Sequence, residues 1–329
     1  MPLIRLPINR IEKNQIMELL KQLYQIHSPS GNEKKMRKFL KDWIKKEVPT
    51  ASFTVDAVGN LYVKKGESET YPCIVAHLDQ VQKTHSRDFQ AVETSGIIFG
   101  FSIRNIQMEG LGADDKNGIW IALKCLQKYP VLKCAFFVQE EVGCRGSNKA
   151  DMTFFFDCRY VLQCDRKGGN DLIWNIGGYT ELCSKEFLSA IGYQEFGYKL
   201  ETGMMTDVEA LKNNGLKISA VNMSCGYHRP HTSEEYTDKT ELLNCLTFVF
   251  HIIETVPAVF PHEDASGWGY GRYVMDEDTD EGEWYDWITD FLFSYPEATL
   301  EDVQDEFECY GLDRDKIEVM YEDIKQMYF

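Results

Sequence analysis

Short, uninterrupted apolar runs recur through the first half of the chain, and segments with helical spacing lie between them. The clearest runs are "CIVAH" at 73–77, "CAFFVQ" at 134–139 and "YVLQC" at 160–164. Runs of this length that are apolar throughout are typical of strands covered on both faces. Strands that alternate with helices predict an α/β fold of three layers, in which a mixed, largely parallel sheet has helices on both faces.

Helical periodicity and its end signals place the elements between these strands. Helices are predicted at 15–26, 117–130 and 240–256. Pro130 and Pro257 end the second and third of them, because proline cannot continue a helix. Residues 51–65 alternate in period two around Gly59 and Asn60, which predicts two strands joined by a turn.

The negative charge of the chain is concentrated at its C-terminal end. The formal net charge is −17, from 52 acidic and 35 basic residues, and residues 262–329 contain 21 of the acids but 4 of the bases. Residues 1–261 therefore hold 31 of each sign. A negative field of this size repels nucleic acids and anionic membranes, so we expect neither as a partner.

The acidic tail divides into two parts by composition. Residues 262–283 are rich in Gly and Asp and are interpreted as a linker. Residues 284–329 carry three amphipathic segments, which predict a small acidic module of three helices. Thr299 and Asp302 have the spacing of a helix-capping pair at the start of the second segment.

The cysteine pattern and the absence of targeting signals favour a cytoplasmic protein. The ten cysteines are scattered, without a C-x-x-C pair, so we expect buried, reduced thiols. No run approaches the ~18 apolar residues of a membrane helix. The first fifteen residues lack the apolar block and cleavage site of a signal peptide.

Several apolar runs end on residue types that bind metal ions. The residues concerned, including two at a predicted helix start and one in a later loop, are His77, Asp79, Asp114, Asp115, Glu140, Glu141, Asp165 and His231. In open α/β sheets the ligand crevice lies at the carboxyl ends of the strands, so these side chains are expected to converge there. Buried carboxylates are costly unless a cation compensates them. The set therefore predicts a site for divalent metal ions.

The adjacent carboxylates of Glu140 and Glu141 suggest two different tasks. A pair of metal ions about 3.5–4 Å apart forms a clamp for hydrolysis and needs a carboxylate between the ions. One of the two glutamates can then bind metal, while the other accepts a proton from the attacking water.

Seven short motifs, in the order in which they occur, resemble one known group of enzymes. They are "SPSGNE", "VGNLYV", "AHLD", "GADDKNG", "QEEVGCRGS", "CD" and "PHTSEE". The group is that of the co-catalytic zinc exopeptidases, which includes peptidase T, the glutamyl aminopeptidases and the secreted bacterial leucine aminopeptidases. The resemblance extends from Ser28 to about Val256 and does not include the acidic tail. It implies the phosphorylase/hydrolase-like fold of that group.

The resemblance also implies a role for each motif residue. It implies two zinc ions, with cobalt or manganese as substitutes, held by His77, Asp114, Glu141, Asp165 and His231. Asp114 resembles the carboxylate that bridges the two ions. Asp79 resembles the acid that orients the imidazole of His77, and Glu140 resembles the general base.

The spacing of the motifs separates the chain from two branches of the group. Asp165 and His231 are 66 positions apart, and His77 and Asp114 are 37 apart. Neither gap holds the inserted domain of peptidase T or of the tetrahedral glutamyl aminopeptidases. The chain therefore resembles most the single-domain leucine aminopeptidase type, and residues 1–261 are expected to form an exopeptidase domain without a lid insertion. Asp165 matches the position at which aminopeptidases and dipeptidases of this group tend to have Asp and carboxypeptidases Glu, so the resemblance implies an aminopeptidase or dipeptidase.

Some positions near the motifs keep two interpretations. His228, three residues before His231, is a rival for the last ligand. Asp115 and Lys116 are either neighbours of the reaction or part of a helix cap.

The roles of two arginines and one aspartate also stay open. Arg145 and Arg166 each follow a proposed ligand closely, and they either hold a substrate carboxylate or pair with local acids. Asp207 either touches the substrate amine or, with Thr206, caps a helix.

Together these features predict a cytoplasmic di-zinc aminopeptidase or dipeptidase that acts on small peptides, as a monomer or a dimer. Water that bridges the two ions is expected to attack after Glu140 takes its proton. Two alternatives stay open. One is an amidohydrolase that deacylates N-acyl amino acids with the same metal centre, and the other is an inactive scaffold that binds a partner through the acidic tail.

Overall fold

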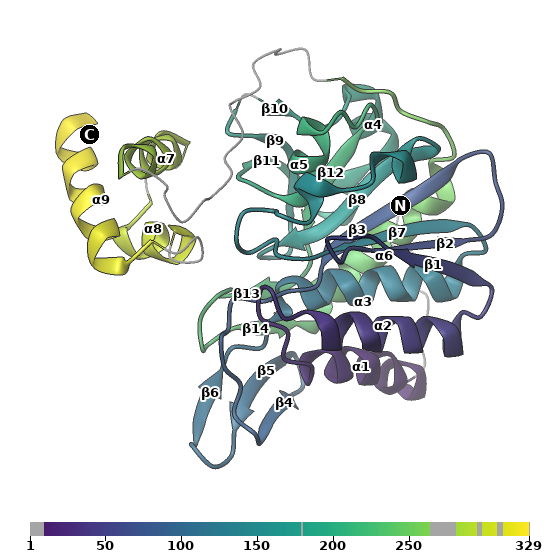
Figure 1. Ribbon diagram of the computed structural model, residues 1–329, viewed down its shortest axis with the longest axis horizontal. Coiled ribbons are helices and arrows are strands. Elements are labelled where there is room, and N and C mark those ends of the chain that lie inside the picture. Colours follow the sequence, from purple (N-terminus) through teal and green to yellow (C-terminus); the bar gives the residue numbers. More distant parts are fainter. Residues whose placement is uncertain (1–9, 179, 264–280, 295–297, 308–311, 329) are drawn as a thin grey trace.

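The structure is a computed structural model that describes residues 10–178, 180–263, 281–294, 298–307 and 312–328. Residues 10–263 form an α/β body, and three further helices follow it (Figure 1). No helix within the described ranges is long and apolar enough to cross a membrane. Most of the predicted linker, residues 264–280, lies outside the described ranges.

A nine-stranded sheet forms the centre of the body. Its strands are β1 (Ala51–Val55), β2 (Leu61–Lys65), β3 (Tyr71–His77), β7 (Leu132–Phe137), β8 (Cys158–Arg166), β9 (Asp171–Ile176), β10 (Thr180–Glu181), β11 (Lys199–Gly203) and β12 (Ala220–Ser224). The order is β1-β2-β7-β3-β8-β12-β9-β10, with β11 paired to β9. The pairs β3–β7, β3–β8, β8–β12 and β9–β11 are parallel, and the others are antiparallel. The predicted mixed, largely parallel sheet is confirmed.

Helices cover both faces of this sheet, as predicted. The body contains α1 (Arg10–Tyr24), α2 (Lys34–Glu47), α3 (Ala113–Lys128), α4 (Lys185–Ile191), α5 (Asp207–Asn213), α6 (Lys239–Thr255) and the short 3₁₀ helices Ser147–Lys149, Met152–Phe155 and Tyr193–Phe196. Alternate residues of β3 point to opposite faces. Ile74 and Ala76 join the core cluster that contains α1–α4 and α6, whereas Cys73 and Val75 join the cluster that contains α5. The continuous apolar runs are thus explained by burial on both sides.

A second, five-stranded sheet lies beside the first and was not predicted. It consists of β4 (Phe89–Glu93), β5 (Ile97–Ser102), β6 (Gln107–Glu109), β13 (Tyr227–His228) and β14 (Tyr236–Asp238), in the order β13-β14-β5-β4 with β6 on β5. Three of its strands, β6, β13 and β14, have two or three residues and carry too little periodicity to be predicted from sequence. The pairing of β14 with β5 matters for function, because it anchors the loop between β13 and β14 that carries His231.

The three C-terminal helices, here called the C-terminal module, form a small core of their own. They are α7 (Glu281–Ser294), α8 (Leu300–Phe307) and α9 (Arg314–Tyr328). The core consists of Trp284, Ile288, Phe291, Leu292, Val303, Phe307, Leu312, Ile317, Met320 and Ile324. At the start of α8 the Thr299 hydroxyl donates to Asp302, and the Asp302 amide donates back to Thr299, as the capping pattern predicted.

The predicted division into body, linker and module stays a prediction, and the described elements on either side of residues 264–280 have the following bounds. The first helix of the module begins at Glu281, three residues before the predicted position. At the other end, the amide of His262 donates to the carbonyl of Lys217, so His262 still belongs to the body. Backbone bonding of this kind leaves no signature in composition, on which the predicted boundaries rested.

Candidate metal centre

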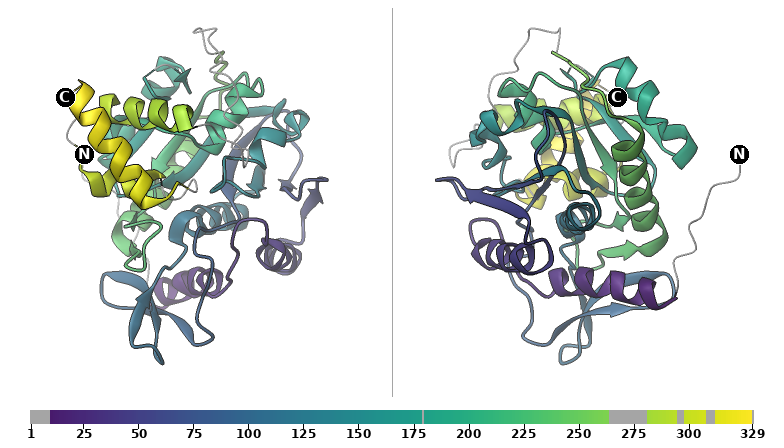
Figure 2. Two further views of the ribbon diagram at one scale, coloured as in Figure 1. Left: turned by 60° about the vertical axis from the view of Figure 1, so that its left-hand side comes forward. Right: turned by 90° about the vertical axis from the view of Figure 1, so that its right-hand side faces the viewer.

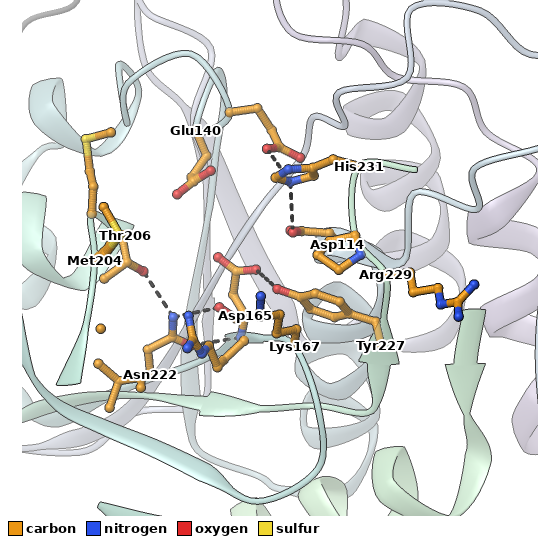
Figure 3. Close-up of a pocket in the computed structure, with 16 residues that line it drawn as sticks. Asp114, Glu140, Asp165, Lys167, Met204, Thr206, Asn222, Tyr227, Arg229 and His231 are labelled. Carbon is orange, nitrogen blue, oxygen red and sulfur yellow. Dashed lines mark hydrogen bonds and ion pairs between the residues drawn. The ribbon is translucent and has the colours of Figure 1, made fainter. Parts of the chain in front are cut away.

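Six residues singled out in the sequence meet at the carboxyl edge of the adjacent parallel strands β7, β3 and β8. They are His77 at the end of β3, Glu140 and Glu141 after β7, Asp165 near the end of β8, Asp114 in the first turn of α3, and His231 in the loop between β13 and β14. Four of them, Asp114, Glu140, Asp165 and His231, are labelled in Figure 3. Parallel neighbours end at the same edge, which is why residues so distant in sequence come together.

Asp114 lies between two histidines and offers one oxygen to each side. Its Oδ1 is 3.0 Å from Nε2 of His77, and its Oδ2 is 3.4 Å from Nε2 of His231. On the first side, Nε2 of His77 also lies 3.7 Å from Oδ1 of Asp165. On the second side, Nε2 of His231 lies 3.2 Å from Oε2 of Glu141. One carboxylate therefore links two separate pairs, each made of a histidine and an acid.

Asp79 ties the end of β3 to the segment after β7. Its Oδ1 is 3.4 Å from Nδ1 of His77 and accepts a hydrogen bond of 3.0 Å from the amide of Glu140. Its Oδ2 accepts one of 2.8 Å from the Ser30 hydroxyl. Asp79 is buried and thus holds the His77 ring and the Glu140 backbone in one arrangement.

Glu235, which was not predicted as a site residue, fixes the start of α3 through hydrogen bonds. Its buried carboxylate accepts hydrogen bonds from the amides of Gly112, Ala113 and Asp114, at 2.6, 2.8 and 3.2 Å. An acid at a helix N-terminus satisfies amides that have no partner in the helix. Glu235 follows His231 by four residues, so one loop positions both a candidate ligand and the backbone of Asp114. In the sequence, the motif "PHTSEE" contains both His231 and Glu235 and could have pointed to Glu235.

The two residues after Asp114 are bonded into the interior of the protein. Asp115 accepts hydrogen bonds from the amides of His77 and Gly118, at 3.2 and 2.9 Å. Asp115 also lies within metal-binding reach of His77 and Asp165, but both of its oxygens already accept backbone donors. Lys116 is buried and donates to the side chain of Gln80. Burial lowers the pKa of Lys116 to about 7.

The remaining open positions fall outside the cluster or at its border. Nε2 of His228 lies 2.6 Å from Glu241, whereas His231 contacts the candidate ligands. Nε of Arg166 lies 3.8 Å from Asp171, and Arg166 also lines the cavity described below. Asp207 is fully buried and accepts from Gln163 at 3.4 Å, and burial raises its pKa to about 7.

The acids of the cluster are crowded and poorly solvated. Burial raises the pKa of Glu141 to about 7. Burial and the charge of Asp114 raise that of Asp165 to about 6. Burial, and then the charge of Asp165, raise the pKa of Glu140 well above its usual value. Although burial lowers the pKa of His77, the charges of Asp165 and Glu140 raise it well above the ordinary range. A cluster of this kind favours any cation that enters it.

The donor set fits divalent metal ions of the zinc type. Oε1 of Glu141 is buried and accepts a hydrogen bond from none of the described residues. Donor atoms of His77, Asp114 and Glu141 lie within 4.8 Å of one another, so the two sides of Asp114 are close enough to belong to one metal centre. Imidazole nitrogens together with carboxylate oxygens are ligands that zinc uses in catalytic sites.

The raised pKa values predict how the stability of the metal-free protein depends on pH. Groups whose pKa is raised on folding stabilise the native state while they are protonated, and this contribution is lost as the pH rises through about 6 and 7. We therefore expect the protein in chelator to be less stable at pH 8 than at pH 5.5, by on the order of 3 kcal/mol. Thermal unfolding at the two pH values measures the difference.

Two comparisons check the origin of this pH effect. In Glu141→Gln combined with Asp165→Asn the pH dependence of the unfolding temperature should be flatter. Added zinc should raise the unfolding temperature more at pH 8 than at pH 5.5, because the metal competes with protons for the same oxygens. An equal pH dependence in the double variant would contradict the assignment.

A cavity of about 270 Å³ opens beside the cluster (Figure 3). The candidate ligands Asp114, Asp165 and His231, together with Glu140, line one part of it, and the remainder is lined by cationic and apolar residues that include Lys167, Arg229, Met204, Met205 and Ile173. The Tyr227 hydroxyl donates to Oδ1 of Asp165 at 3.2 Å, which orients that acid toward the cavity. A small ligand in this cavity would touch both the acids and the apolar wall.

The protein thus has an α/β fold with a largely parallel sheet and a cluster of histidines and acids at the carboxyl edge of that sheet. Solved structures of aminopeptidases have a similar fold.

The fold matches structures of known peptidases. The aminopeptidase PepT from Bacillus cereus is 14% identical, with a TM-score of 0.57 over 75% of this chain and 99% of that one. A tripeptidase from Staphylococcus aureus is 15% identical, with a TM-score of 0.58 over 75% and 98% of the two chains. An aminopeptidase from the archaeon Desulfurococcus kamchatkensis is 16% identical, with a TM-score of 0.58 over 74% and 95%.

These similarities confirm the expected resemblance to the exopeptidases at the level of the fold. No protein-family model and no curated protein sequence matches the chain. The likeness is therefore carried by three-dimensional structure, and the chemistry has to be argued from the residues of the site.

Proposed function

We propose that this chain is a di-zinc aminopeptidase or dipeptidase that removes N-terminal residues from short peptides. The observation that carries the proposal is the position of Asp114, whose two oxygens lie against His77 and His231. His77 and Asp165 would hold one ion, and Glu141 and His231 would hold the other, with Asp114 shared between them. When bound, the ions supply a Lewis acid for the scissile carbonyl and lower the pKa of water.

Glu140 is the group proposed to move the proton. Its carboxylate lines the cavity, and its Oε2 lies 3.8 Å from Nε2 of His77, next to the candidate ligands. From there it takes a proton from the attacking water and passes it to the nitrogen of the leaving amine. Asp79 keeps Glu140 in position through the hydrogen bond from the Glu140 amide. The adjacent glutamates thus divide the work, with Glu141 as ligand and Glu140 as base.

Substrate assays on the reconstituted protein test the proposal. The protein is stripped with a chelator, reloaded with zinc, cobalt or manganese, and assayed on leucyl-p-nitroanilide and on N-acetyl-leucine. We expect cleavage of the anilide only after a metal is returned, because the carboxylates of the cluster need the cation to act together. Cleavage of N-acetyl-leucine alone would identify a deacylase. Failure on both substrates with every metal bound would refute the proposal.

A further inference from the structure

The C-terminal module packs against one wall of the cavity. Met204 and Met205, in the segment between β11 and α5, line the cavity. The same two methionines pack against the core of the module. The three helices stand on the side of the body where β9, β10 and β11 lie (Figure 1), and in the left view of Figure 2 they lie in front of the body. The methionine segment thus has the cavity on one side and the module on the other.

The module also carries an acid that is under the influence of a cation at the cavity. The pKa of Asp302, in the first turn of α8, is lowered first by hydrogen bonds from Thr299 and further by the positive charge of Lys167. Lys167 lines the cavity and follows the candidate ligand Asp165 by two residues. The position of the module at the cavity therefore rests on the contact of Met204 and Met205 with its core, and the charge of Lys167 is a weaker, long-range attraction in the same direction.

The cavity is small, so a long peptide would also contact the surface around it. At about 270 Å³, it lies just below the range of roughly 300–1,000 Å³ that is usual for sites of drug-sized ligands. A peptide of two or three residues can occupy such a volume, whereas a longer one has to continue beyond the rim. Among the described residues the cavity is lined by the body alone, and the module adjoins it through Met204 and Met205.

We propose that the C-terminal module is the outer wall of the substrate site and restricts the enzyme to short peptides. This inference rests on the proposed peptidase function and adds a limit on substrate length to it. The module holds the Met204–Met205 segment against the cavity and occupies the space beyond it. A longer chain that leaves the cavity on this side meets α7 and α8.

The test uses the full chain with one substitution in the core of the module. Ile288 is fully buried in that core and lies outside the cavity, so Ile288→Asp should unfold the module and release the methionine segment. Val319, 59% exposed on α9, supplies the matched control Val319→Asp. Each protein, loaded with zinc, is assayed on a dipeptide and on a decapeptide that begin with the same residue.

We expect Ile288→Asp to raise kcat/KM for the decapeptide about tenfold or more, and to leave that for the dipeptide within about threefold. Val319→Asp should behave as the wild type. If both substrates lose activity together, or if their ratio stays at the wild-type value, the module does not limit substrate length and the inference is wrong.

A milder variant decides the question if Ile288→Asp is insoluble. Asp302→Asn removes the charge that faces Lys167 and keeps a side chain that Thr299 can bond. It should shift the decapeptide-to-dipeptide ratio in the same direction by about twofold. An unchanged ratio in this variant would contradict the proposal.

Hydrogen exchange measures the packing of the module against Met204 and Met205 independently of any activity assay. The backbone amides of Met204 and Met205 should exchange about tenfold faster in Ile288→Asp than in the wild type or in Val319→Asp. Equal exchange in the three proteins would overturn the docking. If exchange follows the expectation but the zinc-loaded wild type cleaves no peptide, the docking stands, while the peptidase function and the length limit are both refuted.

Discussion

Glu140→Gln is expected to reduce kcat on short peptides about a thousandfold and to leave the metal content of the protein unchanged. Glutamine has the shape of glutamate but cannot accept the proton of the attacking water, so the transition state loses about 4 kcal/mol of stabilisation. The amide of residue 140 still donates to Asp79, so the local backbone should be preserved. Steady-state kinetics and metal analysis on the same preparation measure both quantities.

The neighbouring glutamate supplies the matched control for this experiment. Glu141→Gln is the same chemical change one residue away, but Oε2 of Glu141 contacts His231 rather than lying next to His77. We expect this variant to lose one of the two ions. If Glu140→Gln loses metal while Glu141→Gln retains it, the two roles are reversed. If Glu140→Gln works at the wild-type rate, another group is the base.

Asp114→Asn is expected to lose most of both ions, and kcat/KM should fall by about three orders of magnitude or more. The reason is geometric, because the two oxygens of Asp114 lie 3.0 Å from His77 and 3.4 Å from His231. An amide offers one neutral oxygen and cannot hold two cations together. The stabilisation that saturating zinc gives the wild type, about 2.7 kcal/mol at a hundred times the dissociation constant, should largely disappear.

The number of ions lost distinguishes the bridging role from a general loss of charge. Metal analysis after dialysis should give close to no ions per chain for Asp114→Asn and about one for Glu141→Gln. Thermal unfolding with and without zinc provides the second measurement. Two ions retained in Asp114→Asn would mean that the carboxylate between the histidines does not bridge them.

The order of the central elements could be predicted because local patterns report it directly. The apolar runs around Val75 and Ala135 are continuous, since both of their faces are buried. The second sheet could not be predicted, because β14 has three residues and pairs with β5 more than 130 positions away. Such a pairing depends on contacts that no local window contains.

Some residues of the candidate site could likewise be predicted from the sequence, and others could not. The residues that meet at the sheet edge were named from the sequence, although their roles as ligands and base remain predictions. Glu235 was missed as a positioning group, because its partners are the amides of Gly112, Ala113 and Asp114, which every sequence contains. The contact of Met204 with the module was missed too, because apolar side chains carry no mark of their partner.

The sequence by itself determined which side chains can bind a cation and that they stand where strands end, because residue type and strand periodicity are local properties. Only the tertiary structure decided that Asp114 offers one oxygen to each histidine, and that the acidic helices stand behind the cavity wall. The distance of 3.4 Å between Asp114 and His231, which are 117 positions apart, depends on how whole layers pack, and packing is a property of the complete fold.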